Sequence, residues 1–191
     1  MNQARSQLAG AGTSTAALGF GGYFSYPAFS ALTESYNGSA WTEVNDLNTA
    51  RFGLGGAGTQ TAALAFGGAN LPGGPPKDET ELWNGSSWTE VADLTTPKRM
   101  MAAGGTSTSA IAAGGGPPAT ATAETWNGSS WTEVGDLNTA RDALRGAAAN
   151  NTAALAFGGQ LPPGSLANTE SWNGSAWTEV NDLNTARRNM A

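Results

Sequence analysis

The sequence contains no cysteine and no histidine. Their absence excludes disulfide bonds, thiolate nucleophiles and imidazole bases, and it removes most of the side chains that bind zinc or copper. Charged residues are also scarce, at 13% of the chain, and the nine basic residues are scattered while the formal net charge is −6. This charge balance disfavours a phosphate backbone as partner, so we expect no binding of nucleic acid.

Long hydrophobic runs are missing too. The longest strongly apolar runs, such as AALAF, are far too short to span a bilayer, and the segment MNQARSQLAGAG lacks the apolar region of a signal peptide. We therefore expect neither membrane insertion nor export by a visible signal peptide. What the chain does have is 27 glycines without a Gly-X-Y period, and seven tryptophans and six phenylalanines that can form a core.

A nine-residue phrase occurs four times: WNGSSWTEV begins at Trp83 and Trp126, WNGSAWTEV at Trp172, and YNGSAWTEV at Tyr36. The second tryptophan of the phrase recurs after 47, 43 and 46 residues. Each unit contains four short runs, rich in small, β-branched or aromatic residues and bounded by Gly and Asn, which is typical of strands. Four strands with a period in the forties indicate a propeller blade.

The chain is therefore predicted to be all-β, a single small β-propeller of four four-stranded blades. The blades are expected at about 5–47, 51–94, 98–137 and 141–183, followed by a C-terminal tail at 184–191. Because NQARSQLAG near the start and NTARRNMA at the end are the same element, we predict a ring closed by four blades with the tail packed beside blade 1. Two alternatives are that the tail pairs with another molecule and that the chain is a piece of a longer array.

Each unit carries an Asn-Gly pair between its last two strands, at 37–38, 84–85, 127–128 and 173–174. Asn-Gly predicts a type I′ hairpin turn of two residues, which would place Trp172 opposite Ser175 and Glu170 opposite Trp177. Both tryptophans would then lie on one face of the hairpin, to be covered by the next blade. The same asparagines match the N-glycosylation pattern, but a turn explains the Asn and the Gly together and is the favoured interpretation.

A Gly-Gly doublet ends the second run of every unit, at 21–22, 67–68, 114–115 and 158–159. No Lys-Ser pair or helical pattern follows, which argues against a phosphate-binding loop and favours tight backbone packing with unusual φ angles. The first run of each unit, as in LAGAGT and LGGAGT, has almost no side-chain volume. Such a strand suits the crowded axis of a small ring.

Charged residues recur at matched positions: a basic row of Arg5, Arg51, Lys98, Arg141 and Arg187, and acids equivalent to Glu34, Glu43 and Asp46. These rows could form a substrate site, but inter-blade ion pairs and turn caps are the favoured interpretation. One oxygen ligand per blade is too little for a metal site. We predict no catalytic residue, no metal and no cofactor.

The Gly-Gly doublets, the Glu-x-aromatic pattern (Glu34/Tyr36, Glu81/Trp83, Glu124/Trp126, Glu170/Trp172), the following Trp and the basic row together resemble kelch repeats over the whole chain. The phrases NGSAWTEV, DLNTAR and TAALAFGG also resemble kelch-type repeats of predicted marine phage proteins. The resemblance implies a propeller fold and a virion or extracellular context.

The segments that do not repeat are the loops at 23–32, 69–79, 116–122 and 160–168, predicted to share one face with the DLNTAR connectors. Loops that vary on a repeating scaffold are where binding usually lies, although the aromatic residues of the first loop could equally pack over the end of a blade. The expected function is that of a non-catalytic binding or structural module, a virion or tail component of a phage. Its expected partners are other protein subunits or a glycan or protein of the host surface. A further alternative is that the tail joins several copies of the chain into an oligomer. A lectin-like propeller is the alternative, and an enzyme is disfavoured because the acids recur blade by blade. The candidate partner-binding residues are Tyr23, Phe24, Tyr26, Phe29, Leu71, Lys77, Asp78, Gln160 and Leu161.

Overall fold

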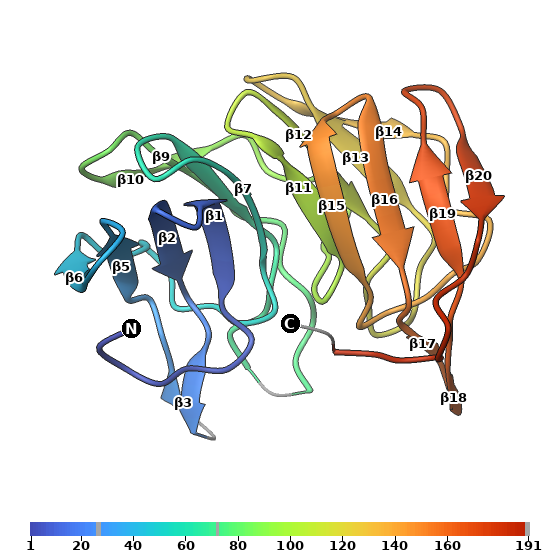
Figure 1. The fold of residues 1–191 in the computed structure, drawn as a ribbon, viewed down its shortest axis with the longest axis horizontal. Helices are drawn as coiled ribbons and strands as arrows, with labels where there is room; N and C mark the ends of the chain where they lie inside the picture. The colour runs from blue at the N-terminus through green and yellow to red at the C-terminus, as the bar shows by residue number, and fades with distance from the viewer. Residues whose placement is uncertain (26–27, 72, 190–191) are drawn as a thin grey trace.

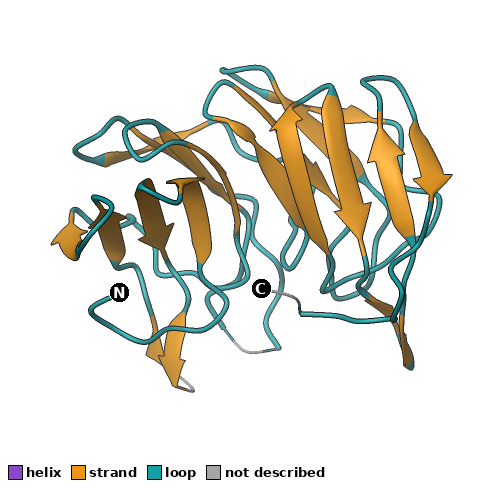
Figure 2. Cartoon of the chain, viewed as in Figure 1, coloured by secondary structure: helices purple, strands orange, loops and turns teal. Residues whose placement is uncertain are grey.

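The computed structural model describes residues 1–25, 28–71 and 73–189. Its described residues form strands and loops without a helix (Figure 2). Four antiparallel four-stranded sheets are arranged as a four-bladed β-propeller, each sheet a meander whose first strand lies nearest the axis (Figure 1). The predicted all-β fold and the number of blades are confirmed.

The strands follow the expected runs of each unit. Blade 1 contains β1 (Ala9–Thr13), β2 (Ala16–Phe20), β5 (Thr33–Tyr36) and β6 (Trp41–Val44), and blade 2 contains β7 (Gly55–Gly58), β8 (Ala63–Phe66), β9 (Thr80–Trp83) and β10 (Trp88–Val91). Blade 3 contains β11 (Ala102–Thr106), β12 (Ser109–Ala113), β13 (Ala123–Trp126) and β14 (Trp131–Val134). Blade 4 contains β15 (Arg145–Asn150), β16 (Ala153–Phe157), β19 (Thr169–Trp172) and β20 (Trp177–Val180).

Two small hairpins extend the loops between the second and third strands of blades 1 and 4. They are β3 (Tyr23–Ser25) with β4 (Ala28–Phe29), and β17 (Gln160–Leu161) with β18 (Gly164–Ser165). Both project from the lower side of the molecule in Figure 1. An axial hollow of about 180 Å³ is lined by residues of all four blades, from Gln7 to Gly146.

The Asn-Gly turns differ from the prediction. Trp172 lies opposite Trp177 and Glu170 opposite Glu179, so the loop has four residues and not two. Only Gly174 has a positive φ, of 93°, because the Asn173 side chain forms the turn by accepting hydrogen bonds from the backbone N–H groups of Ser175 and Ala176 at 2.9 and 3.0 Å. The type I′ assignment was wrong, but the two tryptophans do lie side by side, with ring centroids 5.4 Å apart.

The tryptophan pairs build the core between blades, and the preceding blade covers each pair, not the next blade as predicted. Leu18 of blade 1 packs in one buried cluster with Trp83 and Trp88 of blade 2, and Phe20 meets Trp88 edge to face at 4.9 Å. The Nε1 atom of Trp88 also donates a 3.0 Å hydrogen bond to Oγ1 of Thr33. The interfaces of blade 1 with blade 2 and of blade 2 with blade 3 thus combine apolar burial with a satisfied indole N–H group.

Blade 3 has smaller residues on the face that covers the tryptophan pair of blade 4. Ala113 stands where blades 1 and 2 have Phe20 and Phe66, and Ala123 stands where they have Thr33 and Thr80. The inner strand β15 accordingly contacts both β11 and β12. Among the described residues, Trp177 Nε1 is buried without a hydrogen-bond partner.

Glycines are required where backbones meet. Gly21 and Gly22 have φ values of 69° and 92°, and a Cβ on Gly22 would lie 2.7 Å from the Ser6 carbonyl oxygen. A Cβ on Gly56 of β7 would lie 2.8 Å from the Gly10 carbonyl oxygen of β1. The predicted close approach at the doublets and at the axis is confirmed.

The basic row forms ion pairs within blades and not between them, which corrects the prediction. Its first four members pair with buried glutamates of the third strand of the same blade: Arg5–Glu34 at 2.9 Å, Arg51–Glu81 at 2.8 Å, Lys98–Glu124 at 2.9 Å and Arg141–Glu170 at 3.0 Å. The glutamates also hold the preceding connector, as where Glu81 Oε2 accepts from the Asn48 N–H group at 2.8 Å. The predicted turn caps are present, since Asp46 Oδ1 accepts from the Thr33 N–H group at 3.0 Å.

The junction between blades 4 and 1 differs from the other three. Inner strands adjoin from β1 to β7, β7 to β11 and β11 to β15, but no comparable contact joins β15 to β1 in the described chain. The tail was predicted to pack beside blade 1, and that prediction was wrong. Its described residues are hydrogen-bonded to blade 4, with the Arg187 carbonyl oxygen accepting from the Gly159 N–H group at 2.9 Å and the Asn189 N–H group donating to the Ala143 carbonyl oxygen at 3.0 Å.

Candidate binding site on the loop face

The variable loops and the connectors share one face of the propeller, as predicted, and we call it the loop face. Backbone bridges join the two sets of segments: Ser6 pairs with Tyr23, Phe52 with Ala69, and Asp142 with Gln160. The connectors of blades 1, 2 and 4 therefore support the loop of their own blade. The connector of blade 3 supports two loops, because Lys98 is bridged to Lys77 in the loop of blade 2 and the Arg99 carbonyl oxygen accepts from the Gly116 N–H group at 3.0 Å. The loops are held in place by main-chain hydrogen bonds that do not depend on their varied side chains.

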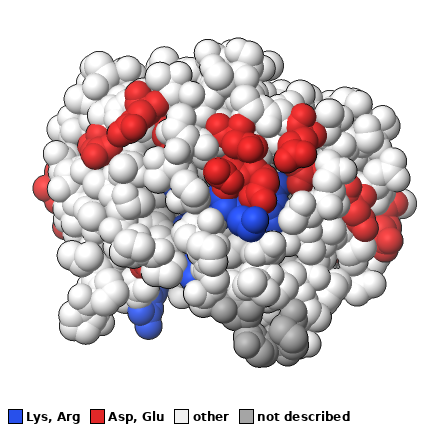
Figure 3. Space-filling view, turned by 180° about the vertical axis from the view of Figure 1, so that it is seen from behind, with Lys and Arg blue, Asp and Glu red and all other residues white. Residues whose placement is uncertain are grey.

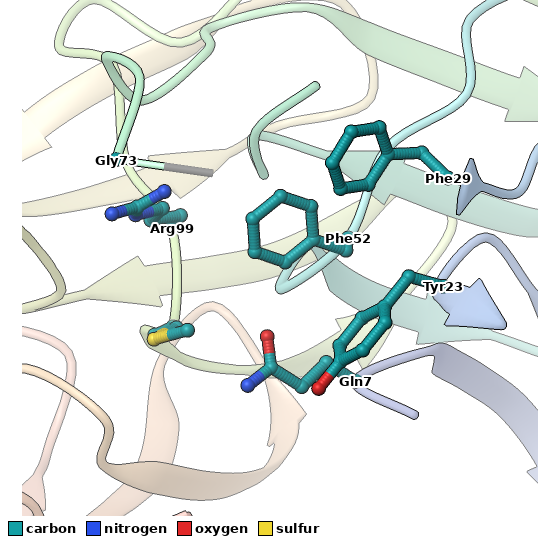
Figure 4. A pocket seen from close by; sticks show the side chains of 7 residues that line it. Gln7, Tyr23, Phe29, Phe52, Gly73 and Arg99 are labelled. Carbon is teal, nitrogen blue, oxygen red and sulfur yellow. The ribbon is translucent and has the colours of Figure 1, made fainter. Parts of the chain in front are cut away.

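A hollow of about 300 Å³ opens on this face over blades 1 to 3 (Figure 4). We call it the loop-face hollow. Tyr23 and Phe29 reach it from the β3–β4 hairpin and Gly73 from the loop of blade 2, while the connectors supply the other lining residues, namely Gln7, Phe52, Arg99 and Met100.

The wall of the hollow is aromatic. Phe52 lies at its centre, stacked on Phe29 with centroids 5.1 Å apart and planes 18° apart, and meets Tyr23 edge to face at 5.8 Å. The Arg99 guanidinium lies 5.8 Å from the Phe52 ring centroid. Rings fixed by one another present a rigid apolar surface, which can bind at a small cost in side-chain entropy.

Polar groups stand at two sides of this aromatic wall. Within the described ranges, Gln7 Oε1 is buried and has no hydrogen-bond partner, so a residue that lines the hollow carries an unused acceptor. Arg99 Nε donates to the Gly116 carbonyl oxygen at 3.1 Å, which holds the guanidinium beside the hollow. A buried acceptor without a partner is rare in folded proteins and is often found at sites of function.

The electrostatics of the hollow are set by Arg99 and Asp142. Burial lowers the pKa of Arg99 from its ordinary value, and the charge of Asp142 offsets part of that effect. Asp142 Oδ1 is itself buried without a hydrogen-bond partner among the described residues. Arg99 remains a cation at neutral pH, so the hollow favours a ligand that carries an acceptor or an anion beside an apolar group.

The predicted site residues are distributed over the loop face. Tyr23 and Phe29 come together in the hollow, whereas Phe24, Leu71 and Leu161 are exposed at loop tips with 41%, 58% and 47% of their surface accessible. Tyr26 lies outside the described residues.

The three polar residues of the prediction hold the loops themselves. Lys77 pairs with Glu79 at 2.9 Å, and Asp78 accepts a hydrogen bond from the Leu94 N–H group through its carbonyl oxygen at 3.0 Å. Gln160 is bridged to Asp142 and contacts Arg188. The structure thus separates residues that form the loops from those that line the hollow or project from the tips.

Sequence reasoning missed Gln7, Phe52, Arg99 and Met100. A signal was present, because the two positions after each basic residue are the part of the connector that varies most: Ser-Gln, Phe-Gly, Arg-Met and Asp-Ala. The second position has a left-handed backbone in each unit, with φ of 52° at Gln7, 63° at Gly53, 53° at Met100 and 51° at Ala143. Two of the residues that precede this turn, Phe52 and Arg99, line the hollow.

The remaining surface is mostly neutral or acidic. Acidic side chains form several separate groups on the face shown in Figure 3, with few basic ones. In the part of the chain that the structure describes, no three acidic side chains gather in a way that could hold a metal ion. Nor do those residues include a helix of the length and apolarity that crossing a membrane requires.

No protein-family model matches the chain, and no curated protein matches its sequence.

Proposed function

We propose that the chain is a non-catalytic binding module, a kelch-type propeller that serves as a virion or tail-associated component of a phage and contacts a protein partner through its loop face. The observation that carries the proposal is the loop-face hollow with its stacked rings. Phe24 and Leu71 stand exposed at loop tips on the same face. An aromatic pocket bordered by exposed apolar residues is typical of a protein contact, in which one anchor side chain enters the pocket.

The positions of the acidic side chains support a non-catalytic role. Among the described residues that line the hollow there is no carboxylate, and the glutamates of the third strands are engaged in buried ion pairs. General acid–base catalysis needs titratable groups placed at the bound ligand. Among the described lining residues the charged side chain is Arg99, and the acidic group that acts on it is Asp142, outside the lining.

The virion placement is tested by purifying particles of the phage that encodes the chain and identifying their proteins by mass spectrometry. Peptides of this chain in the intact particles are the expected result. Peptides found only in the infected-cell lysate would contradict it. Binding of the isolated chain to the same particles, compared with a Phe24→Ser/Leu71→Ser variant, then tests whether the loop tips form the contact.

A lectin-like module is the second candidate, favoured by one observation, the unpaired Gln7 Oε1 beside the Phe52 ring. A sugar ring stacks on an aromatic face, its hydroxyl could donate to Gln7, and a carboxylate on the sugar would suit Arg99. An array of neutral and carboxylated glycans tests it. We expect the carboxylated glycans to bind best. The Gln7→Leu variant should lose at least tenfold in glycan affinity, whereas the exposed Gln3→Leu control should keep the affinity of the wild type. A silent array with folded protein rejects this candidate.

A further inference from the structure

The open junction between blades 4 and 1 leaves two complementary faces uncovered. At the three complete interfaces, a large aliphatic residue of one blade is buried against the tryptophan pair of the next: Leu18, Leu64 and Ile111 are 2%, 0% and 2% exposed. The equivalent residue of blade 4 is Leu155, which is 42% exposed. Blade 4 therefore ends in an apolar surface of the kind that the other blades bury.

The surface around Leu155 is hollowed. A shallow groove of about 480 Å³ runs along β15 and β16, with Ala147, Ala149 and Ala153 beside Leu155. These alanines are exposed, whereas Ala57, the counterpart of Ala147 in blade 2, is 3% exposed. Val180 at the outer edge is also 42% exposed, so the open surface extends across the blade.

Blade 1 presents the matching half. Tyr36 and Trp41 form the same tilted pair, with centroids 5.0 Å apart, but both are only partly buried, while the corresponding tryptophans of blades 2 to 4 are buried. The hydrogen bonds that cross two of the complete interfaces are also lacking here. Trp88 and Trp131 donate to Thr33 and Thr80 at 3.0 Å, but in the described chain Trp41 Nε1 has no acceptor and Thr169 receives no indole N–H.

We propose that a second copy of this chain seats its blade 1 on blade 4 of the first copy, head to tail. The three interfaces already in the molecule define the contact. Leu155 packs on the Tyr36–Trp41 pair of the second copy, Phe157 meets that Trp41 as Phe20 meets Trp88, and Trp41 Nε1 donates to Thr169 Oγ1.

A head-to-tail contact between copies closes when the rotation permits it. Two copies, each offering both faces, form a ring of about eight blades, which lies at the upper end of the range for propellers. The closed ring buries both hydrophobic ends of each chain.

The tail provides a second contact between the same copies. Arg187 is the exposed fifth member of the basic row, and within residues 1–25, 28–71 and 73–189 no carboxylate pairs with it. In blade 1, Glu34 accepts from the Asn2 N–H group at 2.6 Å and from Arg5 at 2.9 Å. Asn184 and Arg187 have the same spacing as Asn2 and Arg5, so the tail of the first copy replaces segment 2–5 of the second when the faces meet.

Mass measurements test the assembly, with Leu155→Asp as the disrupting variant and Leu161→Asp as its matched control. Both leucines are exposed to a similar degree, 42% and 47%, but Leu161 lies on the β17–β18 hairpin outside the junction. Light scattering across a concentration series should show wild type and Leu161→Asp reaching at least twice the chain mass of 19.3 kDa. Leu155→Asp should remain a monomer. Arg187→Gln should assemble only at a protein concentration at least fivefold higher than the wild type requires. A monomeric wild type at about 100 μM, or equal disruption by both aspartates, overturns the proposal.

Cysteine pairing separates assembly from closure of one chain on itself, and the absence of native cysteine makes the readout clean. Ala17 is the counterpart of Ala63, which packs in one buried cluster with Leu18 across the interface of blades 1 and 2, so it should meet Leu155 of the other copy. Leu155→Cys and Ala17→Cys are made as single variants, mixed and oxidised. A mixed disulfide-linked pair supports head-to-tail docking. A double variant that oxidises within one chain, without gain in mass, shows that blade 4 meets blade 1 of the same chain and rejects the proposal.

Discussion

Replacing Ala123 by threonine should stabilise the protein, because it would give Trp177 the acceptor that the equivalent tryptophans have. Trp88 and Trp131 donate to buried threonine hydroxyls at 3.0 Å, whereas Ala123 leaves Trp177 Nε1 buried without a partner in the described structure. A net intramolecular hydrogen bond contributes about 1 kcal/mol, and the penalty of an unsatisfied buried donor is about 1–3 kcal/mol. A gain of about 1 kcal/mol corresponds to a rise in Tm of about 2–4 °C for a chain of this length.

The measurement is urea unfolding of wild type, Ala123→Thr and Ala123→Val. Valine has the shape of threonine without the hydroxyl, so the difference between the two variants isolates the hydrogen bond from the added volume. The reverse change, Thr80→Val, should cost about 1–3 kcal/mol by leaving Trp131 Nε1 unpaired. If threonine is no more stabilising than valine at position 123, the hydrogen-bond reasoning is refuted. If both are strongly destabilising, the closer packing of β15 on β11 and β12 leaves no room for the side chain.

Two further predictions concern charge. Glu81→Gln should lower the free energy of unfolding by about 3–5 kcal/mol, because it breaks a buried pair with Arg51 and leaves the guanidinium uncompensated. The matched control is Glu90→Gln, at the exposed residue opposite Glu81 on β10, which should change the free energy of unfolding by less than about 0.5 kcal/mol. Equal effects in urea unfolding would contradict the assigned roles. Burial raises the pKa of Glu79, but its hydrogen bonds and the charge of Lys77 outweigh this effect and lower the pKa below its ordinary value of 4.5. The stabilisation that the Lys77–Glu79 pair gives the folded protein is therefore present above pH 4.5. It is lost as the pH falls through the pKa of Glu79 in the folded state. Lys77→Met should therefore be less stable than wild type by under about 1 kcal/mol at pH 7, with a smaller difference at pH 3; the same difference at both pH values would exclude the ion pair as its source.

Much of the blade could be predicted because local signals agree with the packed structure. The two tryptophans of the repeated phrase were expected on the last two strands of each blade, and in blade 4 Trp172 ends β19 and Trp177 begins β20. The glycine doublets were expected to allow tight backbone packing with unusual φ angles, and Gly21 and Gly22 have positive φ angles. The same residue type occurs at the same backbone conformation in four successive blades, so each blade independently supports the predicted strands and glycine positions.

The errors arise where a side chain, and not the backbone preference, decides the geometry. Asn-Gly usually signals a two-residue turn, but Asn173 caps its own turn through Oδ1 and lengthens the loop to four residues. The basic row was assigned to contacts between blades because sequence order alone does not tell which of two recurring acids is in reach. Arg51 reaches Glu81 across the width of its own sheet, 30 residues away.

The loop-face hollow shows how an asymmetric site arises on a symmetric scaffold. The position after the basic residue always pairs with, or lies beside, the loop of its own blade, yet its side chain is Phe52 in blade 2, Arg99 in blade 3 and Asp142 in blade 4. Phe52 gathers Tyr23 and Phe29 by stacking, whereas Asp142 brings no ring, and its loop partner is Gln160. The hollow therefore forms over blades 1 to 3 without any change in strand register. Because that position can vary while the Arg–Glu pairs keep the connector in place, the scaffold separates recognition from folding, and new specificity requires changes only beside the basic row and in the loops.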